Sequence, residues 1–321
     1  MSPGRVPISE DATRVYPPLI VIAGATATGK TGLSIRLAQS IPGAEIISAD
    51  SRQVYRGLDI GTAKVPAADR GGIPHHGLDL VEPDAPFSVA DFAPHADAVL
   101  AALGRRPGVA ILVGGTGLYL RAVARGLPFG DVPSDAAVRA RIEVELASTG
   151  LPALAARVRR LAPNLAAHTD LRNPRRVARA LEIAELQGDR PLPAPRGYPG
   201  PALWLGLSVD RAVHRGWIAE RAGGQFAAGL IEEAAALRAR YPAPLRSLSA
   251  IGYPEAFGVL AGRLTLDEAI AEDVRRNIAF ARRQQTWFRA ESGIEWFDAT
   301  SADPLAWARA RARALIDPVA R

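Results

Sequence analysis

Residues 19–31 read LIVIAGATATGKT, and this segment indicates the fold class more clearly than any other. The apolar run at 19–23 is typical of a buried strand. The pattern G-x-x-x-x-G-K-T follows directly, as it does where a strand turns into a helix. In such a loop, the backbone amides and the positive end of the helix surround an anion. The segment therefore predicts a strand, a phosphate-binding loop and a helix.

The loop at 24–31 is predicted to hold a diphosphate. Glycines at both ends of its pattern allow backbone angles that a Cβ would penalise. Lys30 adds a point charge, and it is one of only two lysines, with Lys64, among 39 basic residues. Thr31 is a candidate Mg²⁺ ligand. The alternative to a phosphate-binding loop is an ordinary glycine-rich turn with a solvated lysine. The predicted diphosphate or nucleotide ligands are Gly24, Ala25, Thr26, Ala27, Thr28, Gly29, Lys30 and Thr31.

Two further apolar runs extend this pattern into a parallel sheet. Residues 44–49 end at Asp50, residues 109–113 end at the turn Gly114-Gly115-Thr116-Gly117, and a helix is expected over 89–103 between them. The alternation predicts an α/β fold, namely a P-loop NTPase-like parallel sheet flanked by helices, with a further strand at 202–209. The carboxyl ends of the strands then bring the phosphate loop, Asp50 and Thr116 to one edge.

The chain is expected to divide into a core, an insertion and a short lead-in. Residues 131–200 change character, with helical spacing over 136–146, 151–161 and 174–187 before a proline-rich return. We expect a flexible N-terminal lead-in at 1–17, a catalytic core at 18–130 and 201–321, and a helical insertion domain at 131–200. Residues 56–88 are expected to be a long loop region. Further core helices are expected at about 211–223, 226–240, 253–260, 266–291 and 304–316.

Composition excludes several classes of site and favours an anionic partner. The 321 residues include no cysteine, which excludes disulfides, thiolate zinc sites and cysteine nucleophiles. The net charge of +6 favours a polyanion such as nucleic acid, although an arginine-rich composition alone has the same effect on charge. No apolar stretch approaches the length of a membrane span, and no signal peptide is recognised. We expect a cytoplasmic monomer without a membrane contact.

Asp50 and Thr116 follow two neighbouring strands and are candidates for chemistry. A carboxylate beside a phosphate loop serves either as a general base on the acceptor or as a water-mediated Mg²⁺ ligand. Alternatively, Asp50 caps the backbone that follows it. Thr116 either hydrogen-bonds a phosphate oxygen or the base–acceptor pair, or it caps the next helix.

Several basic side chains are open to two interpretations. Arg283 either clamps a diphosphate or lies on a solvated helix face. The pair His75-His76 is more typical of a polar loop than of a metal site. Like charges that share a helix face repel each other, so a polyanion opposite them would be favourable, whereas a solvated basic face needs none. The arginines with this spacing are Arg172, Arg175, Arg176 and Arg179, and Arg139 and Arg141 would extend the patch.

Together these segments resemble the tRNA dimethylallyltransferase (tRNA isopentenyltransferase) family, of the bacterial type. The resemblance runs over roughly residues 18–298. The phosphate loop is generic, whereas the other blocks together are specific. Departures are Ser249, where many members have Gln, and Ala25, where many have Pro. The blocks are Gly24–Thr31, Ile47–Tyr55, Asp59–Lys64, His75-His76, Ala90–Phe92, Gly114–Tyr119, Asn173–Arg176, Ala250–Tyr253 and Arg283–Trp287.

The resemblance implies transfer of a dimethylallyl group from dimethylallyl diphosphate to the exocyclic amine of the adenosine 3′-adjacent to the anticodon. The tRNAs concerned read codons that begin with U. Asp50 would be the general base, Thr116 its support, and Arg283 and Mg²⁺ would join the loop on the diphosphate. The anticodon stem-loop would contact Asp50, Ser51, Arg52, Gln53, Thr116, Arg139, Arg175, Arg176, Val177, Ala178 and Arg179.

Three other functions stay open from the residues alone. A small-molecule kinase would use the same loop with ATP as donor. An adenylate isopentenyltransferase would prenylate free AMP, and neither enzyme needs an arginine-rich insertion. A regulatory NTP-binding, RNA-binding protein would not need a reactive Asp50.

Overall fold

The structure, a computed structural model, describes residues 15–129 and 131–317 and divides into two compact units. The first unit runs up to Arg125 and resumes at Gly197, and the second is Gly126–Arg196. Most of the lead-in expected at 1–17 lies outside the described residues. Its described end is packed, since the rings of Tyr16 and Tyr198 meet edge to face with centroids 5.6 Å apart.

A six-stranded parallel sheet forms the centre of the first unit within the described residues, which confirms the predicted α/β fold. The strand order is β3-β2-β4-β1-β5-β6, so β1 lies between β4 and β5. The strands are β1 (Leu19–Gly24), β2 (Ala44–Ser48), β3 (His75–His76), β4 (Val109–Gly114), β5 (Ala202–Ser208) and β6 (Ile294–Asp298).

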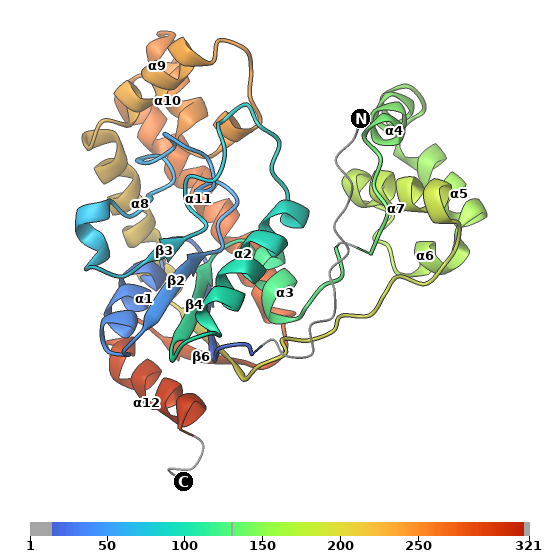
Figure 1. Cartoon of the computed structure of the whole chain (residues 1–321). Coiled ribbons are helices and arrows are strands. Elements are labelled where there is room, and N and C mark those ends of the chain that lie inside the picture. Colours follow the sequence, from blue (N-terminus) through green and yellow to red (C-terminus); the bar gives the residue numbers. More distant parts are fainter. Residues whose placement is uncertain (1–14, 130, 318–321) are drawn as a thin grey trace. The chain divides into compact units, whose positions relative to one another are not determined.

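Helices cover both faces of this sheet because its central strands are apolar on both sides. Leu19 and Val21 of β1 belong to one buried cluster, and Ile20 and Ile22 belong to the other. One face is covered by α1 (Lys30–Gln39) and α12 (Pro304–Ile316), which contact each other. The opposite face is covered by α2 (Val89–Leu103), α3 (Gly117–Ala124) and α11 (Leu266–Arg289) (Figure 1).

The remaining helices of the first unit pack against α11, either directly or through a neighbouring helix. These helices are α8 (Arg211–Ala227), α9 (Leu230–Arg240) and α10 (Tyr253–Leu260), and the short 3₁₀ helices are η1 (Ala67–Arg70) and η2 (Ser247–Ser249). α8 and α10 contact α11 directly, and α9 packs against α10. In the part of the chain that the structure describes, no helix is long and apolar enough to cross a membrane.

The second unit is a small helical domain with its own core. It contains α4 (Ala136–Thr149), α5 (Leu151–Leu161), α6 (Pro163–Ala167) and α7 (Pro174–Gln187). Its buried residues include Ile142, Leu154, Val158 and Leu181. The two ends of the domain meet, because the amide of Arg196 donates to the carbonyl of Gly126 at 2.9 Å. The amide of Gly197 likewise donates to the carbonyl of Arg125 at 3.0 Å, in the first unit.

Several elements differ from the sequence prediction. The loop expected over 56–88 contains η1 and the two-residue strand β3, which pairs with Ile46 and Ile47. α11 ends at Arg289, two residues before the predicted end, and β6 lies in the segment after it, where no element was predicted. α6 likewise lies between two predicted helices. The helix expected from residue 226 begins at Leu230 instead. Gly229 adopts φ 102°, which is not a helical value, and so separates α8 from α9.

Candidate active site

The phosphate loop has the conformation that its glycines predict. Gly29 adopts φ 83° at the N-cap of α1, in the left-handed region. A Cβ on Gly24 would lie 2.8 Å from the carbonyl oxygen of Leu207 in β5, so the close strand approach excludes a side chain there. Ala27 also has a positive φ, 56°, although it carries a Cβ. This strain at a non-glycine residue was not predictable from the loop pattern.

Lys30 is buried beneath this loop. Its Nζ donates to the carbonyl oxygen of Ala25, within the loop itself. Burial lowers the pKa of Lys30 to about 7, and the positive charge of Arg221 lowers it further, whereas Asp50 opposes the shift. Because an anion in the loop would favour the ammonium form, the lysine can gain its charge as the ligand arrives.

Arg221 is a loop-binding residue that sequence reasoning missed. Its Nη1 donates to Oγ1 of Thr26 at 2.9 Å, and Nε2 of His214 lies 2.8 Å from the carbonyl oxygen of Thr26. Burial lowers the pKa of Arg221, while the charges of Asp50 and Asp273 oppose that shift. The only signal in the sequence is the seven-residue spacing of His214 and Arg221, which places both on one face of α8.

One amide of the loop does not face the predicted anion. The Thr26 amide donates to Oε1 of Gln284 at 2.8 Å. The prediction that all the loop amides point at one ligand is therefore wrong at this position. Nε2 of the same Gln284 donates to the carbonyl oxygen of Gly115 at 2.9 Å.

Asp50 and Thr116 lie together at the ends of β2 and β4. Oγ1 of Thr116 accepts a hydrogen bond from the Ser51 amide at 3.0 Å, and it does not cap α3. Oδ1 of Asp50 accepts from the Arg52 amide at 2.8 Å, which closes a turn, and no helix follows it. Within residues 15–129 and 131–317, Oδ2 of Asp50 has no hydrogen-bond partner. That oxygen can accept a proton from a ligand.

Arg52 and Gln53 use their side chains within the protein. The guanidinium of Arg52 donates to the carbonyl of Arg246 at 2.8 Å and to Oγ of Ser249 at 3.2 Å. The side-chain Nε2 of Gln53 donates to the carbonyl oxygen of Thr62 at 3.1 Å. In this conformation both side chains brace the segments around Asp50, so their contact with RNA stays a prediction.

Arg283 lies on the exposed side of α11. Its guanidinium carbon is 5.7 Å from the ring centroid of Phe280. It makes no hydrogen bond or ion pair with any described residue. The contact with a diphosphate that the sequence predicts for Arg283 therefore stays a prediction, and Arg221 is the arginine seen at the loop.

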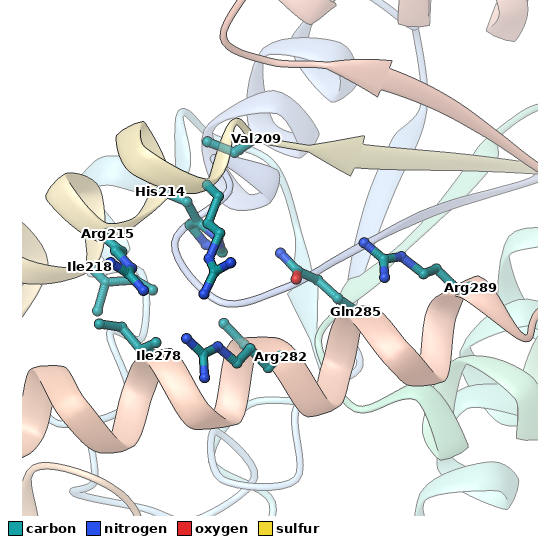
Figure 2. A pocket seen from close by; sticks show the side chains of 10 residues that line it. Val209, His214, Arg215, Ile218, Ile278, Arg282, Gln285 and Arg289 are labelled. Carbon is teal, nitrogen blue, oxygen red and sulfur yellow. The ribbon is translucent and has the colours of Figure 1, made fainter.

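A cavity of about 480 Å³ opens between α8 and α11, next to the phosphate loop. Figure 2 shows Arg282, Gln285 and Arg289 extending from α11 towards α8, and Arg215 extending from α8. Arg211 also lines it. None of these four arginines has an acidic partner among the residues that the structure describes. An anion in this cavity would therefore meet uncompensated positive charge.

The arginines of the second unit fall into two classes. Arg139 and Arg179 bind the carboxylate of Glu182, which is 0% exposed, with shortest distances of 3.1 and 2.7 Å. Arg175 and Arg176 are exposed at the start of α7. Glu182 therefore offsets part of the predicted basic face. Arg172 and Arg141 pair with Asp170 and Glu185, respectively, and Arg175 and Arg176 stay exposed.

The RNA contact of Val177 stays a prediction, and its buried side chain leaves only the backbone for such a contact. Val177 is 0% exposed and belongs to the core of the second unit, whereas Ala178 is partly buried. Helical periodicity explains the difference, since Val177 lies on the face of α7 opposite the solvent.

Two further residues in the family-like blocks, His76 and Lys64, make polar contacts within the protein. His76 binds Glu45 at 2.7 Å, and no cluster of potential metal ligands occurs among the described residues. The buried Nζ of Lys64 pairs with Asp59 at 2.5 Å and Asp79 at 2.6 Å. These ion pairs fold the segment at 59–64 beside the site.

Comparison with known proteins identifies the family. The family model described as IPP transferase matches residues 53–291. The chain belongs to the IPP transferase family. A second model, isopentenyl transferase, matches residues 17–70, which include the phosphate loop.

Curated and solved members of the IPP transferase family match nearly the whole chain. A tRNA dimethylallyltransferase from Symbiobacterium thermophilum is 43% identical over 291 residues, covering 89% of this chain and 91% of that protein. The crystal structure of the tRNA isopentenylpyrophosphate transferase from Bacillus halodurans is 38% identical with a TM-score of 0.70, covering 94% and 97%. A eukaryotic dimethylallyltransferase acting on tRNA, 24% identical with a TM-score of 0.73 and covering 95% and 80%, shows the same fold.

Proposed function

We propose that this member of the IPP transferase family transfers a dimethylallyl group from dimethylallyl diphosphate to an adenosine of tRNA. The acceptor is the exocyclic amine of the adenosine 3′-adjacent to the anticodon, in tRNAs that read codons beginning with U. The observation that carries the proposal is the placement of three charged groups in one site. Lys30 and Arg221 lie at one end and Asp50 lies at the other, and the three charges interact electrostatically.

The phosphate loop would stabilise the leaving diphosphate. The bond from the allylic carbon to the diphosphate oxygen breaks, and the electron pair stays on the diphosphate. Lys30 and Arg221, both buried, would offset that negative charge. The hydroxyl of Thr31 has no hydrogen bond to any described residue, and one protein oxygen beside a diphosphate suits Mg²⁺. Mg²⁺ held there by Thr31 would neutralise charge on the leaving group.

Asp50 would take the proton of the acceptor amine. The amine nitrogen bonds to the allylic carbon and loses a proton, and Oδ2 of Asp50 is free to receive it. Thr116 holds the Ser51 amide, so it fixes the backbone next to this carboxylate. The adenine must leave its stack to reach Asp50, as in other enzymes that act on bases.

The arginines would bind the RNA backbone. Arg175 and Arg176 offer exposed charge on the second unit, and the arginine-lined cavity offers it on the first. Phosphate contacts of this kind position RNA without reading its sequence. A kinase or an enzyme acting on free AMP would need neither group of arginines.

The proposal is tested by incubating the protein with unmodified tRNA and dimethylallyl diphosphate labelled in its alkyl carbons. We expect the label in RNA, released on digestion as isopentenyladenosine, and an equal amount of free diphosphate. Label in AMP would indicate the adenylate enzyme, and phosphate transferred from ATP would indicate a kinase. Either result without label in RNA would refute the proposal.

A further inference from the structure

The turn Gly115-Thr116-Gly117 is held against α11 by two side chains of that helix. A Cβ built on Gly115 would lie 2.3 Å from Nε2 of Gln284, and one on Gly117 would lie 2.3 Å from the ring of Trp287. Neither glycine has a positive φ, so backbone conformation requires neither of them. The two glycines make room for Gln284 and Trp287.

Gln284 joins this turn to the phosphate loop. Its Oε1 accepts from the Thr26 amide at 2.8 Å, and its Nε2 donates to the Gly115 carbonyl at 2.9 Å. The side chain is 7% exposed, so water replaces neither bond readily. Both capacities of the carboxamide, accepting and donating, are needed for this link.

The link continues from the turn to Asp50. Thr116 follows Gly115, and its amide donates to the carbonyl of Ala49 at 3.2 Å. Its Oγ1 accepts from the amide of Ser51 at 3.0 Å. Hydrogen bonds therefore connect Thr26, on the diphosphate side, with the residues on either side of Asp50, on the acceptor side.

We propose that Gln284 is a positioning residue that fixes the spacing between the phosphate loop and Asp50. The inference rests on the proposed function. A transfer between an amine and an allylic carbon depends steeply on their separation, because both groups must be held close and aligned. Loss of the link lowers turnover at saturating substrate concentrations, while the groups that bind each substrate stay in place and binding is largely unchanged.

The kinetic test compares Gln284→Met, Gln284→Glu and Thr286→Val with the wild type. Methionine fills the space without either bond, and glutamate accepts from Thr26 but cannot donate to Gly115. Thr286 is the control, because among the described residues its hydroxyl bonds only the Arg282 carbonyl of its own helix. We expect Gln284→Met to lower kcat about 10- to 100-fold, with each KM within about threefold of wild type. Gln284→Glu should lose at least as much, and Thr286→Val nothing.

A kcat for Gln284→Met within about twofold of the wild type would overturn the positioning role. If the methionine variant does not fold, Gln284→Asn replaces it under the same criteria, because its shorter amide cannot reach both partners. A change in KM alone, with kcat kept, would also refute the proposal, since it would mean that Gln284 acts only in binding.

Hydrogen exchange tests the same link without activity. In Gln284→Met, the amides of Thr26 and Ser51 should both exchange faster, while amides within α11 keep their protection. Unchanged exchange at Ser51 would refute the coupling, whether or not the wild type transfers a prenyl group. A wild type that transfers none would refute the proposed function alone.

Discussion

Arg221 lies in the middle of α8, yet its guanidinium donates to the hydroxyl of Thr26 in the phosphate loop at 2.9 Å. This contact brings a second cation close to Lys30, and its positive charge makes the ammonium form of Lys30 less favourable. Asp50 acts in the opposite direction on both. The site without an anion is therefore poised to bind one, because a diphosphate would relieve the repulsion.

Binding of inorganic diphosphate is expected to take up a proton at Lys30. With a pKa of about 7, this lysine is mostly neutral at pH 8, and a bound anion raises its pKa. Affinity should therefore fall as pH rises above 7. Calorimetry at pH 8 in buffers of different ionisation enthalpy measures the proton count. Lys30→Met should remove about one proton from it, and an unchanged count would contradict the assignment.

The same depressed pKa has a consequence for stability without ligand. Between pH 7 and the ordinary lysine pKa of 10.5, the unfolded chain binds a proton that the folded chain lacks. The contribution of Lys30 to the free energy of unfolding therefore rises with pH across this window. Urea unfolding at pH 7 and pH 9 should show a smaller rise for Lys30→Met than for the wild type, and equal rises would count against the shifted pKa.

Replacement of Asp50 by Asn should abolish proton transfer while leaving the diphosphate site intact. The amide keeps an oxygen for the Arg52 amide but is not basic. We expect single-turnover transfer to fall about 10²- to 10⁴-fold. The dissociation constant of diphosphate should stay within about threefold, since Asp50 is not among the loop ligands. A variant that keeps the wild-type rate would exclude Asp50 as the base.

The exposed pair Arg175 and Arg176 should contribute to the salt dependence of tRNA binding. With both replaced by Ala, the slope of log affinity against log salt should shrink by about two, one for each lost phosphate contact. Arg159→Ala with Arg160→Ala is the matched control, because this exposed pair on α5 removes the same charge from the same unit. Equal effects of the two double variants would indicate unspecific attraction.

Gly117→Ala should destabilise the first unit. Its Cβ would lie 2.3 Å from the Trp287 ring, and the guanidinium carbon of Arg121 lies over this ring at 4.5 Å from its centroid. We expect a loss of about 1–3 kcal/mol in the free energy of unfolding, measured in urea. In Gly224→Ala, in α8, the new Cβ would meet no described atom within 4 Å outside the helix's own backbone, so this variant should instead gain about 0.5–1 kcal/mol. A neutral Gly117→Ala would mean that Trp287 moves freely.

The sequence predicted the elements whose signals are local. The strand at 19–24, the loop glycines and the helices of the insertion follow from apolar periodicity and from Gly and Pro, and the ends of β2 and β4 follow from the parallel arrangement. β3 was not predictable because two residues carry no periodicity, and they are paired only by the register with Ile46 and Ile47. β6 is half-exposed and short, so its pattern is weak.

The site residues divide in the same way, into those with a local sequence signal and those placed by tertiary packing. The phosphate loop, Asp50 and Thr116 stand in motifs, whereas Arg221 reaches the loop from a helix nearly two hundred residues later, 195 positions from Thr26. Glu182 stands in no such motif. Its full burial between Arg139 and Arg179 depends on the packing of α4 on α7, which no single segment encodes.

The hydrogen bonds at Arg125 and Gly197 give the helical unit a consequence for how the family can diverge. Since the chain leaves and rejoins the first unit at one point, the excursion is a closed loop, and its entropic cost grows only slowly with length, by about 0.6 kcal/mol for each doubling. Helices can be lengthened, exchanged or added there while the sheet keeps its register. Under the proposed function, recognition of different RNAs could therefore evolve beyond this stem without disturbing the phosphate loop and Asp50.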